Sequence, residues 1–234
     1  MVGRWIVGTN YRSSTAWILR GMQSMTDIII VGAGGHSKVV ADAAARAGFA
    51  IMGFVDDRAN TAPLPGYRLI GSITGLANVG FPDGAVKFLV AIGDNRTRMQ
   101  VVEELALPAG RYATVIDPSA VVSRYASIAE GSVVLQGAIV NAGAEVGQHA
   151  ILNTGCTVDH DCRIGDYAHV SPGANLAGGV VVGDGAHLGI GACVIPGCSM
   201  GAWSVVGSGA AVVRDIPVKC VAVGVPAKVV RTLP

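Results

Sequence analysis

The sequence has few charged residues, few aromatic residues and no long apolar run. Asp, Glu, Lys and Arg make up 14% of the 234 residues and the formal net charge is +1, so the chain has no basic field for binding nucleic acid. No uninterrupted apolar segment approaches the ~20 residues that a membrane-spanning helix needs. The apolar residues are instead interspersed with 33 glycines, a distribution typical of short strands joined by tight corners.

Cysteine is also scarce. The chain has five cysteines and no CxxC pair, which argues against a disulfide framework and indicates a reducing, cytoplasmic compartment. Residues 1–24 contain three arginines, no acidic residue and no compact apolar stretch of the kind found in secretory signals. We expect them to form a disordered extension, and a mitochondrial-type presequence is the alternative that their composition leaves open.

The second half of the chain is dominated by a six-residue repeat. An aliphatic residue recurs every six positions, 17 times without a break, from Ile116 to Val212. In the sixteen complete hexads, the residue four positions after the aliphatic one is Ala, Ser or Cys, with Val180 as the one bulky exception, and Cys156, Cys162 and Cys198 belong to this small-residue column. Three positions after each aliphatic residue, glycine occurs in ten of the sixteen complete hexads. A period of six fits neither an α-helix nor a series of hairpins, but it is the known signature of a parallel β-helix.

These columns have a direct physical interpretation. The aliphatic side chains point inward and stack from coil to coil, the small residues let a narrow prism close, and glycine supplies the positive φ that a sharp corner requires. We therefore predict a parallel β-helix over residues 113–217 and a capping segment over residues 218–234. We expect the cysteines of the small-residue column to be inert core residues.

The N-terminal part predicts a Rossmann-like β-α-β unit, which we place at residues 25–112. An apolar strand over Asp27–Val31 precedes the glycine-rich turn Gly32–Ser37, a helix is expected over Lys38–Ala47, and a second strand over Ile51–Val55. A further strand is expected over Val86–Ile92. Nucleotides commonly bind at such a turn, at the carboxyl end of the first strand of a parallel sheet. Because Ser37 stands where a dinucleotide fingerprint has its third glycine, a nicotinamide cofactor and a turn that serves only packing both stay open.

Together these features resemble a known enzyme family. The segment 116–213 resembles the hexapeptide-repeat acyltransferases, whose left-handed β-helix makes one triangular coil from three hexads, and the ending 223–228 (VGVPAK) resembles the segment that follows their helix. An α/β unit followed by such a helix resembles, across residues 26–232, the PglD-like nucleotide-sugar acetyltransferases and the related sialic acid O-acetyltransferases. The resemblance implies a homotrimer with sites between subunits and acetyl-CoA as the acetyl donor. It further implies N-acetylation at C4 of a nucleotide-linked 4-amino-4,6-dideoxy sugar, GDP-perosamine or a UDP-linked amino sugar, for surface-polysaccharide (lipopolysaccharide or O-antigen) biosynthesis.

One histidine stands out by its own neighbours. His160 has Asp159 and Asp161 on either side, and a carboxylate beside an imidazole stabilises the cation and can fix the tautomer, which makes the other nitrogen a better base. The segment 153–161 resembles the family's catalytic stretch. The resemblance makes His160 the general base and Asp161 the residue that raises its basicity, with Asp159 as the alternative.

The resemblance also assigns binding roles. The nucleotide sugar would contact residues of the glycine turn, the Asp-Asp pair, a later glycine and an asparagine beside the catalytic pocket: Gly34, Gly35, His36, Asp56, Asp57, Gly93 and Asn153. Acetyl-CoA would contact His169, Gly178, Ile190, Pro196 and Ser208, the last standing where the family often has glycine. His187 lies 18 residues after His169 and should stack on it in the next coil, without a role implied by the family.

Three other functions are weighed against this one. Sialic acid-type O-acetylation is the nearest rival among enzymes. A non-catalytic nucleotide-sugar-binding scaffold has no need of the Asp-His-Asp corner. A zinc site like that of γ-class carbonic anhydrases typically includes two histidines five residues apart, and no pair here has that spacing, so we expect no metal.

Overall fold

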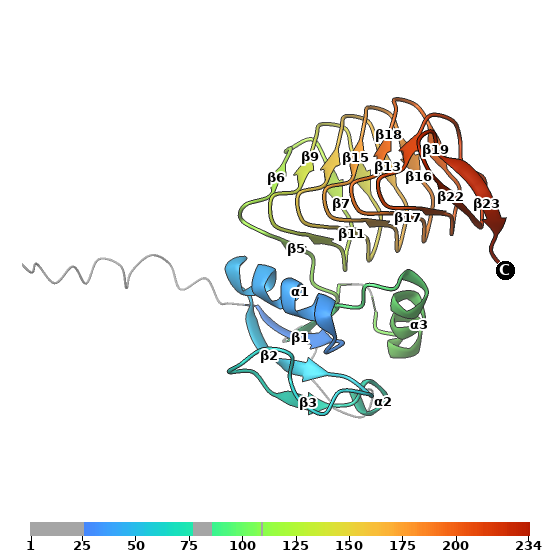
Figure 1. Ribbon diagram of the computed structural model, residues 1–234. Coiled ribbons are helices and arrows are strands. Elements are labelled where there is room, and N and C mark those ends of the chain that lie inside the picture. Colours follow the sequence, from blue (N-terminus) through green and yellow to red (C-terminus); the bar gives the residue numbers. More distant parts are fainter. Residues whose placement is uncertain (1–25, 77–85, 109) are drawn as a thin grey trace, which may run out of the picture.

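The structure, a computed structural model, describes residues 26–76, 86–108 and 110–234. A small α/β unit lies against one side of a β-helix that carries the C-terminus at its far end (Figure 1). The extension expected at residues 1–24 lies outside the described residues. No helix in the described ranges combines the length and the apolar character that crossing a bilayer would require.

The N-terminal unit is a parallel sheet with the strand order β3-β2-β1-β4. Its elements are β1 (Asp27–Val31), α1 (Gly35–Arg46), β2 (Ala50–Val55), β3 (Leu69–Gly71), α2 (Ile73–Leu76), β4 (Val86–Val90) and α3 (Asn95–Leu105). The predicted β-α-β order is confirmed. The helix α1 begins at Gly35 rather than at the predicted Lys38. The backbone is extended at the N-cap Gly34, and the last three residues of the glycine-rich turn already belong to the helix. The strand β4 ends at Val90, since Ile92 and Gly93 leave the sheet to line a cavity.

The predicted β-helix is confirmed. Its coils are made of two-residue strands: β5 (Val115–Ile116), β6 (Val121–Val122), β7 (Ser127–Ile128), β8 (Val133–Val134), β9 (Ile139–Val140), β10 (Glu145–Val146), β11 (Ile151–Leu152), β12 (Thr157–Val158), β13 (Arg163–Ile164), β14 (His169–Val170), β15 (Asn175–Leu176), β16 (Val181–Val182), β17 (His187–Leu188), β18 (Cys193–Val194), β19 (Ser199–Met200), β20 (Val205–Val206) and β21 (Ala211–Val212). The strands β22 (Cys220–Val223) and β23 (Lys228–Thr232) pair antiparallel and end the helix.

Each short strand pairs in parallel with the strand three further along the chain, so that one coil takes 18 residues. This pairing builds three faces. Face I contains β5, β8, β11, β14, β17 and β20, face II contains β6, β9, β12, β15, β18 and β21, and face III contains β7, β10, β13, β16 and β19. We name the edges by the faces that they join, in chain order: edge I/II, edge II/III and edge III/I.

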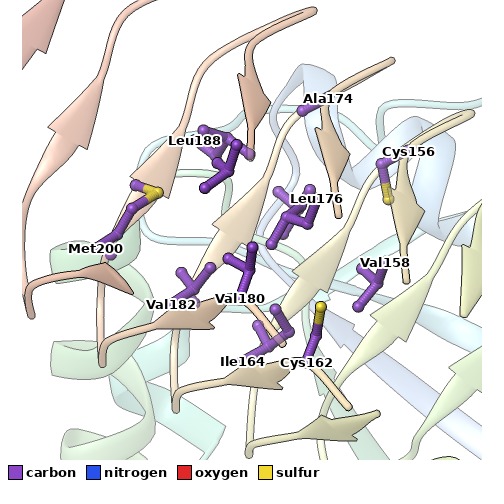
Figure 2. Close-up of a cluster of buried hydrophobic side chains, with 14 of the residues drawn as sticks. Cys156, Val158, Cys162, Ile164, Ala174, Leu176, Val180, Val182, Leu188 and Met200 are labelled. Carbon is purple, nitrogen blue, oxygen red and sulfur yellow. The ribbon is translucent and has the colours of Figure 1, made fainter. Parts of the chain in front are cut away.

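The interior of the prism holds the aliphatic column and the small-residue column, including Cys156 and Cys162 (Figure 2) and, further along, Cys198. From Val134 to Val212 the aliphatic column is buried, whereas Ile116 is 38% exposed because it lies in the first coil. Burial raises the pKa of the Cys156 thiol to about 12, so this cysteine is inert at neutral pH, as expected.

The corners depend on positive φ, as the glycine column predicts. Within the sixteen complete hexads, four corner residues adopt the same left-handed conformation without being glycine: His149, Asp161, Tyr167 and Trp203, with φ between 53° and 58°. This conformation costs a non-glycine residue about 1 kcal/mol. The Asp161 side chain contacts His160, Trp203 lies under Arg96, and the stacked rings of His149 and Tyr167 meet the N-terminal unit at Tyr112.

Face I carries the N-terminal unit. Its outward residues Val115, Val133 and Ile151 pack with residues of β1 and α1 and are at most 2% exposed. The helix α3 meets edge III/I, where the Asn95 side-chain amide donates to the carbonyls of Gly185 and Ala186. Edge II/III is therefore the edge opposite the face that the N-terminal unit covers.

Candidate active site

A cavity of about 460 Å³ opens at the carboxyl ends of β1 and β4. Its walls include all six residues expected in the N-terminal unit: Gly34, Gly35, His36, Asp56, Asp57 and Gly93. The polar wall residues that the sequence did not predict are Arg58 and three polar residues of α3, Thr97, Gln100 and Glu104. The start of α3 has a recognisable sequence signal in Asp94, whose side chain caps the helix by accepting from the Thr97 backbone N–H at 2.8 Å.

The two aspartates at the cavity brace its loops. Asp56 accepts from the backbone N–H of Ala33 and Arg58 at 2.7 Å and of Ala59 at 2.8 Å, and Asp57 accepts from that of Ile73 at 2.9 Å. Burial raises the pKa of Asp56, but the backbone donors outweigh it and leave the pKa below its usual value. The sequence pattern gave no sign of this bracing.

A cluster of stacked histidines adjoins the cavity. The rings of His169 and His187 stack with centroids 4.7 Å apart, as the 18-residue spacing predicted, and the His36 ring lies 6.2 Å from that of His169. The His169 Nε2 lies 3.0 Å from the side-chain amide nitrogen of Asn153, and the His187 Nε2 lies 2.8 Å from the Ser171 hydroxyl. An amide N–H can donate only to an unprotonated Nε2, so the Asn153 contact indicates a neutral His169.

The lowered pKa values of the histidines also favour the neutral form. Burial, followed by the neighbouring His187, Arg98 and His36, lowers the pKa of His169 to about 2, while the backbone of Gly93 acts in the opposite direction. Burial and then Arg98 lower the pKa of His36 to about 4. These imidazoles are uncharged at neutral pH and can each donate one hydrogen bond and accept one.

The candidate catalytic pair lies on edge II/III. The His160 Nδ1 is 2.8 Å from the Asp161 Oδ2, and both side chains are mostly exposed. The Asp161 hydrogen bond, followed by the charge of Asp159, raises the pKa of His160 above its usual value. Asp159 is engaged elsewhere, because its Oδ1 accepts from the Asn141 side chain at 2.9 Å and from the His160 backbone N–H at 2.8 Å. With Nδ1 bound to Asp161, His160 Nε2 is the nitrogen left to take a proton.

Gly178 follows His160 one coil later on the same edge. A methyl group added at Gly178 would overlap the His160 ring, Nε2 foremost, so the absence of a side chain here makes room for the imidazole. Pro196 comes one further coil along, and the backbone bond from the Gly197 N–H to the Gly178 carbonyl, 3.1 Å, joins these coils.

The remaining residues expected at the acetyl-CoA site lie elsewhere. His169 is on face I, and Ile190 and Ser208 stack on edge I/II, where the Gly209 N–H donates to the Ile190 carbonyl at 2.8 Å. Asn153, expected beside His160, instead contacts His169 at the start of the same edge I/II. The candidate residues therefore lie in two separate groups, which we call the partial sites: the cavity with its histidine cluster near edge I/II, and His160 with Gly178 and Pro196 on edge II/III.

Among the described ranges, which omit residues 1–25, 77–85 and 109, no three His, Cys, Asp or Glu side chains form a group able to hold a metal ion.

The N-terminal unit is similar to a known family. The family described as the PglD N-terminal domain matches residues 27–105. A curated UDP-N-acetylbacillosamine N-acetyltransferase of Bacillus subtilis is 43% identical over 115 residues, which is 47% of this chain. The match spans about half the length of that curated relative, 52%.

Solved structures match almost the whole chain. The acetyltransferase domain of PglB from Neisseria gonorrhoeae superimposes with a TM-score of 0.82 at 38% identity, covering 88% of this chain and 100% of that one. This chain belongs to the hexapeptide-repeat nucleotide-sugar N-acetyltransferases. The PglB domain has also been solved in complex with acetyl coenzyme A. A second member of the family, PerB from Caulobacter crescentus, was solved in complex with CoA and GDP-perosamine; it superimposes with a TM-score of 0.81 at 40% identity, covering 88% of this chain and 97% of that one.

Proposed function

We propose that the protein transfers the acetyl group of acetyl-CoA to the C4 amino group of a nucleotide-linked 4-amino-4,6-dideoxy sugar. The observation that carries the proposal is that the same chain has two features. One is a cavity with glycine walls at the carboxyl ends of a parallel sheet, and the other is the hydrogen-bonded pair of His160 and Asp161 on edge II/III. Support comes from the PerB complex with CoA and GDP-perosamine and from the PglB complex with acetyl coenzyme A. Both GDP-perosamine and a UDP-linked amino sugar fit this proposal.

In the proposed reaction, the unprotonated amine attacks the carbonyl carbon of the thioester. A C–N bond forms, and the amine nitrogen of the tetrahedral intermediate passes a proton to His160 Nε2. The intermediate then collapses, the C–S bond breaks, and the imidazolium returns the proton to the leaving CoA thiolate. Asp161 accepts from Nδ1–H throughout, which holds the ring with Nε2 toward the amine and stabilises the imidazolium.

The binding roles follow the two partial sites. The cavity would hold the nucleotide, with Gly34 and Gly35 allowing close approach of the diphosphate to the start of α1. The sugar would then extend past His36 toward Asn153 and His169, where the acetyl end of acetyl-CoA meets it. The perosamine N-acetyltransferase of Caulobacter crescentus was also solved as a histidine-to-asparagine variant in complex with CoA and GDP-perosamine.

We further propose a homotrimer in which neighbouring copies complete each site. Face II lies between the two edges that carry the partial sites, and its outward column is uncharged: Val121, Ile139, Thr157, Asn175, Cys193 and Ala211. If the three copies turn face II toward a common axis, edge II/III of one copy meets edge I/II of the next. His160 of one copy then reaches the sugar that lies in the cavity of its neighbour.

The test is an assay of the purified protein with acetyl-CoA and a panel of GDP- and UDP-linked amino sugars, following the release of the free CoA thiol. We expect a nucleotide-linked 4-amino sugar to release CoA, and the His160→Ala variant to lose about 10²–10⁴ in kcat while still binding the nucleotide sugar. Release of CoA with sialic acid but with none of the amino sugars would instead identify the O-acetyltransferase. A His160→Ala variant as fast as the wild type would remove the proposed base.

A further inference from the structure

The first turn of α3 contains a buried arginine that the proposed mechanism does not use. Arg98 is 1% exposed and is among the largest fully buried side chains. A guanidinium stays charged in a protein interior, and burying it is costly unless its donors are bound. The contacts that Arg98 makes therefore indicate what it is there to hold.

Five oxygen atoms accept from Arg98, and they belong to both parts of the molecule. Within the N-terminal unit, Nη1 donates to the carbonyls of Ile92 at 2.8 Å and Gly93 at 3.3 Å, and Nη2 donates to the side-chain oxygen of Asn95 at 2.8 Å.

On the β-helix, Nε donates to the carbonyl of His149 at 2.9 Å and Nη2 to that of Tyr167 at 2.7 Å. These two carbonyls belong to consecutive coils on edge III/I, so one rigid planar group spans the cavity wall and two coils.

The β-helix accommodates this contact at a conformational cost. His149 and Tyr167 hold the left-handed corner conformation that glycine adopts at most other corners. Their rings stack with centroids 5.3 Å apart, and the Tyr112 ring meets that of His149 edge-on at 4.6 Å. Gly131, one coil earlier, has no side chain where the His149 ring lies. Edge III/I is thus shaped over several coils to receive α3 and the chain around Tyr112.

We infer that Arg98 is a positioning residue for the proposed reaction: its guanidinium fixes the Ile92–Gly93 wall of the nucleotide cavity against the β-helix, and its cation faces the histidine cluster that adjoins the cavity. The inference rests on the proposed function for its kinetic consequences. Gly93 is the link, because it lines the cavity, lies against His36 and is held by Arg98.

The positive charge of Arg98 lowers the pKa of the histidines around it. After burial itself, Arg98 contributes to the lowered pKa of His36, His149, His169 and His187. The groups that oppose it are Asp94 for His187, and Glu130 and Asp166 for His149. Tyr112 and Tyr167 complete the surroundings, and burial raises the pKa of both, so neither supplies a negative charge at neutral pH. Removing the Arg98 charge should therefore let the histidines of the cluster protonate at higher pH.

Two variants separate the geometric role from the electrostatic one. Arg98→Lys keeps the charge but loses the planar fork, and Arg98→Met loses both. The matched control is Arg96→Gln, on the same turn of α3, where the guanidinium lies over the Trp203 ring, 5.0 Å from its centroid. The measurements are KM for the nucleotide amino sugar and for acetyl-CoA, the Kd of GDP and UDP, and the histidine pKa values from NMR titration of ring-labelled protein.

For Arg98→Lys we expect kcat/KM for the nucleotide sugar to fall about 100-fold, the loss that a displacement of about 1 Å can cause, with the histidine titrations unchanged. For Arg98→Met we expect the same loss together with histidines that titrate at higher pH, and Arg96→Gln should match the wild type in both respects. Wild-type kinetics in Arg98→Lys, or unchanged titrations in a folded Arg98→Met, would overturn the inference. If the wild type acetylates no amino sugar, the proposed function fails. Weaker binding of GDP or UDP by the two Arg98 variants, together with shifted histidine titrations in Arg98→Met, would still support the positioning role of Arg98.

Discussion

Gly178→Ala probes edge II/III directly because it adds one methyl group against the His160 ring. Gly178 does not have positive φ, so alanine is compatible with its backbone. The new Cβ would overlap the imidazole, with Nε2 and Cε1 most affected. The ring has to move by about 1 Å to restore a normal contact of 3.5–4.0 Å.

The expected loss follows from that displacement. A misplacement of about 1 Å can cost 10²-fold, and the full contribution of a general base is typically 10²–10⁴. The movement also strains the 2.8 Å hydrogen bond from His160 to Asp161. We expect kcat of Gly178→Ala to fall about 100-fold while its thermal stability and its affinity for the nucleotide sugar stay near those of the wild type.

A double-mutant cycle shows whether the effect passes through His160. If it does, the double variant Gly178→Ala/His160→Ala should be no slower than His160→Ala alone, because the displaced group is already absent. Additive losses, or a rise in KM for acetyl-CoA with kcat unchanged, would mean that Gly178 serves the acetyl-CoA channel that the sequence resemblance implied, and would refute the role in placing His160.

Three further predictions concern pH, stability and assembly. Activity should fall as the pH drops through the raised pKa of His160. The Asp161→Asn variant, in which asparagine can adopt the left-handed corner conformation, should shift this loss of activity to lower pH and reduce kcat. If the loss of activity stays at the same pH, Asp161 is not the group that raises the pKa of His160. Burial, followed by the charge of Arg98, lowers the pKa of His149 to about 4, so the unfolded chain binds a proton that the folded chain excludes, and stability is lost as the pH falls from about 6.5 toward 4. His149→Asn should therefore remove about 2 kcal/mol of the difference in unfolding free energy between pH 7 and pH 4.5, measured in urea; an equally steep dependence would contradict this. Cys193→Arg, on exposed face II, should give a monomer by light scattering, while Ser127→Arg on face III should leave a trimer; the reverse result would place the interface on face III.

The β-helix was predictable because every hexad repeats the same demands. The aliphatic residue recurs 17 times, a small residue fills its position in fifteen of the sixteen complete hexads and glycine in ten, so single exceptions such as Val180 do not obscure the pattern. The same 18-residue coil places Gly178 above His160 and Ser208 above Ile190, so the division of the site between two edges was already implicit in the spacing.

Other parts of the site had no pattern to reveal them. Arg98 is one arginine among several polar residues of α3, and it is buried only because the N-terminal unit docks on a corner that includes Tyr167, 69 residues further along the chain. The bracing of the cavity by Asp56 likewise depends on where the backbone N–H of Ala33 comes to lie, 23 residues away. Contacts of this kind depend on how segments distant in the sequence pack together, which neither local propensity nor periodicity describes.

The central claim is that each site takes its nucleotide cavity from one copy of the chain and His160 from the next. It is tested most directly by mixing two inactive variants, His160→Ala and a cavity variant such as Gly93→Trp, and allowing the trimers to reassemble from both. About a quarter of the sites in a random mixture would combine an intact cavity with an intact His160, so activity should reappear at about that fraction of the wild-type rate. A mixture as inactive as either variant alone, with mixed trimers shown to have formed, would contradict the shared site.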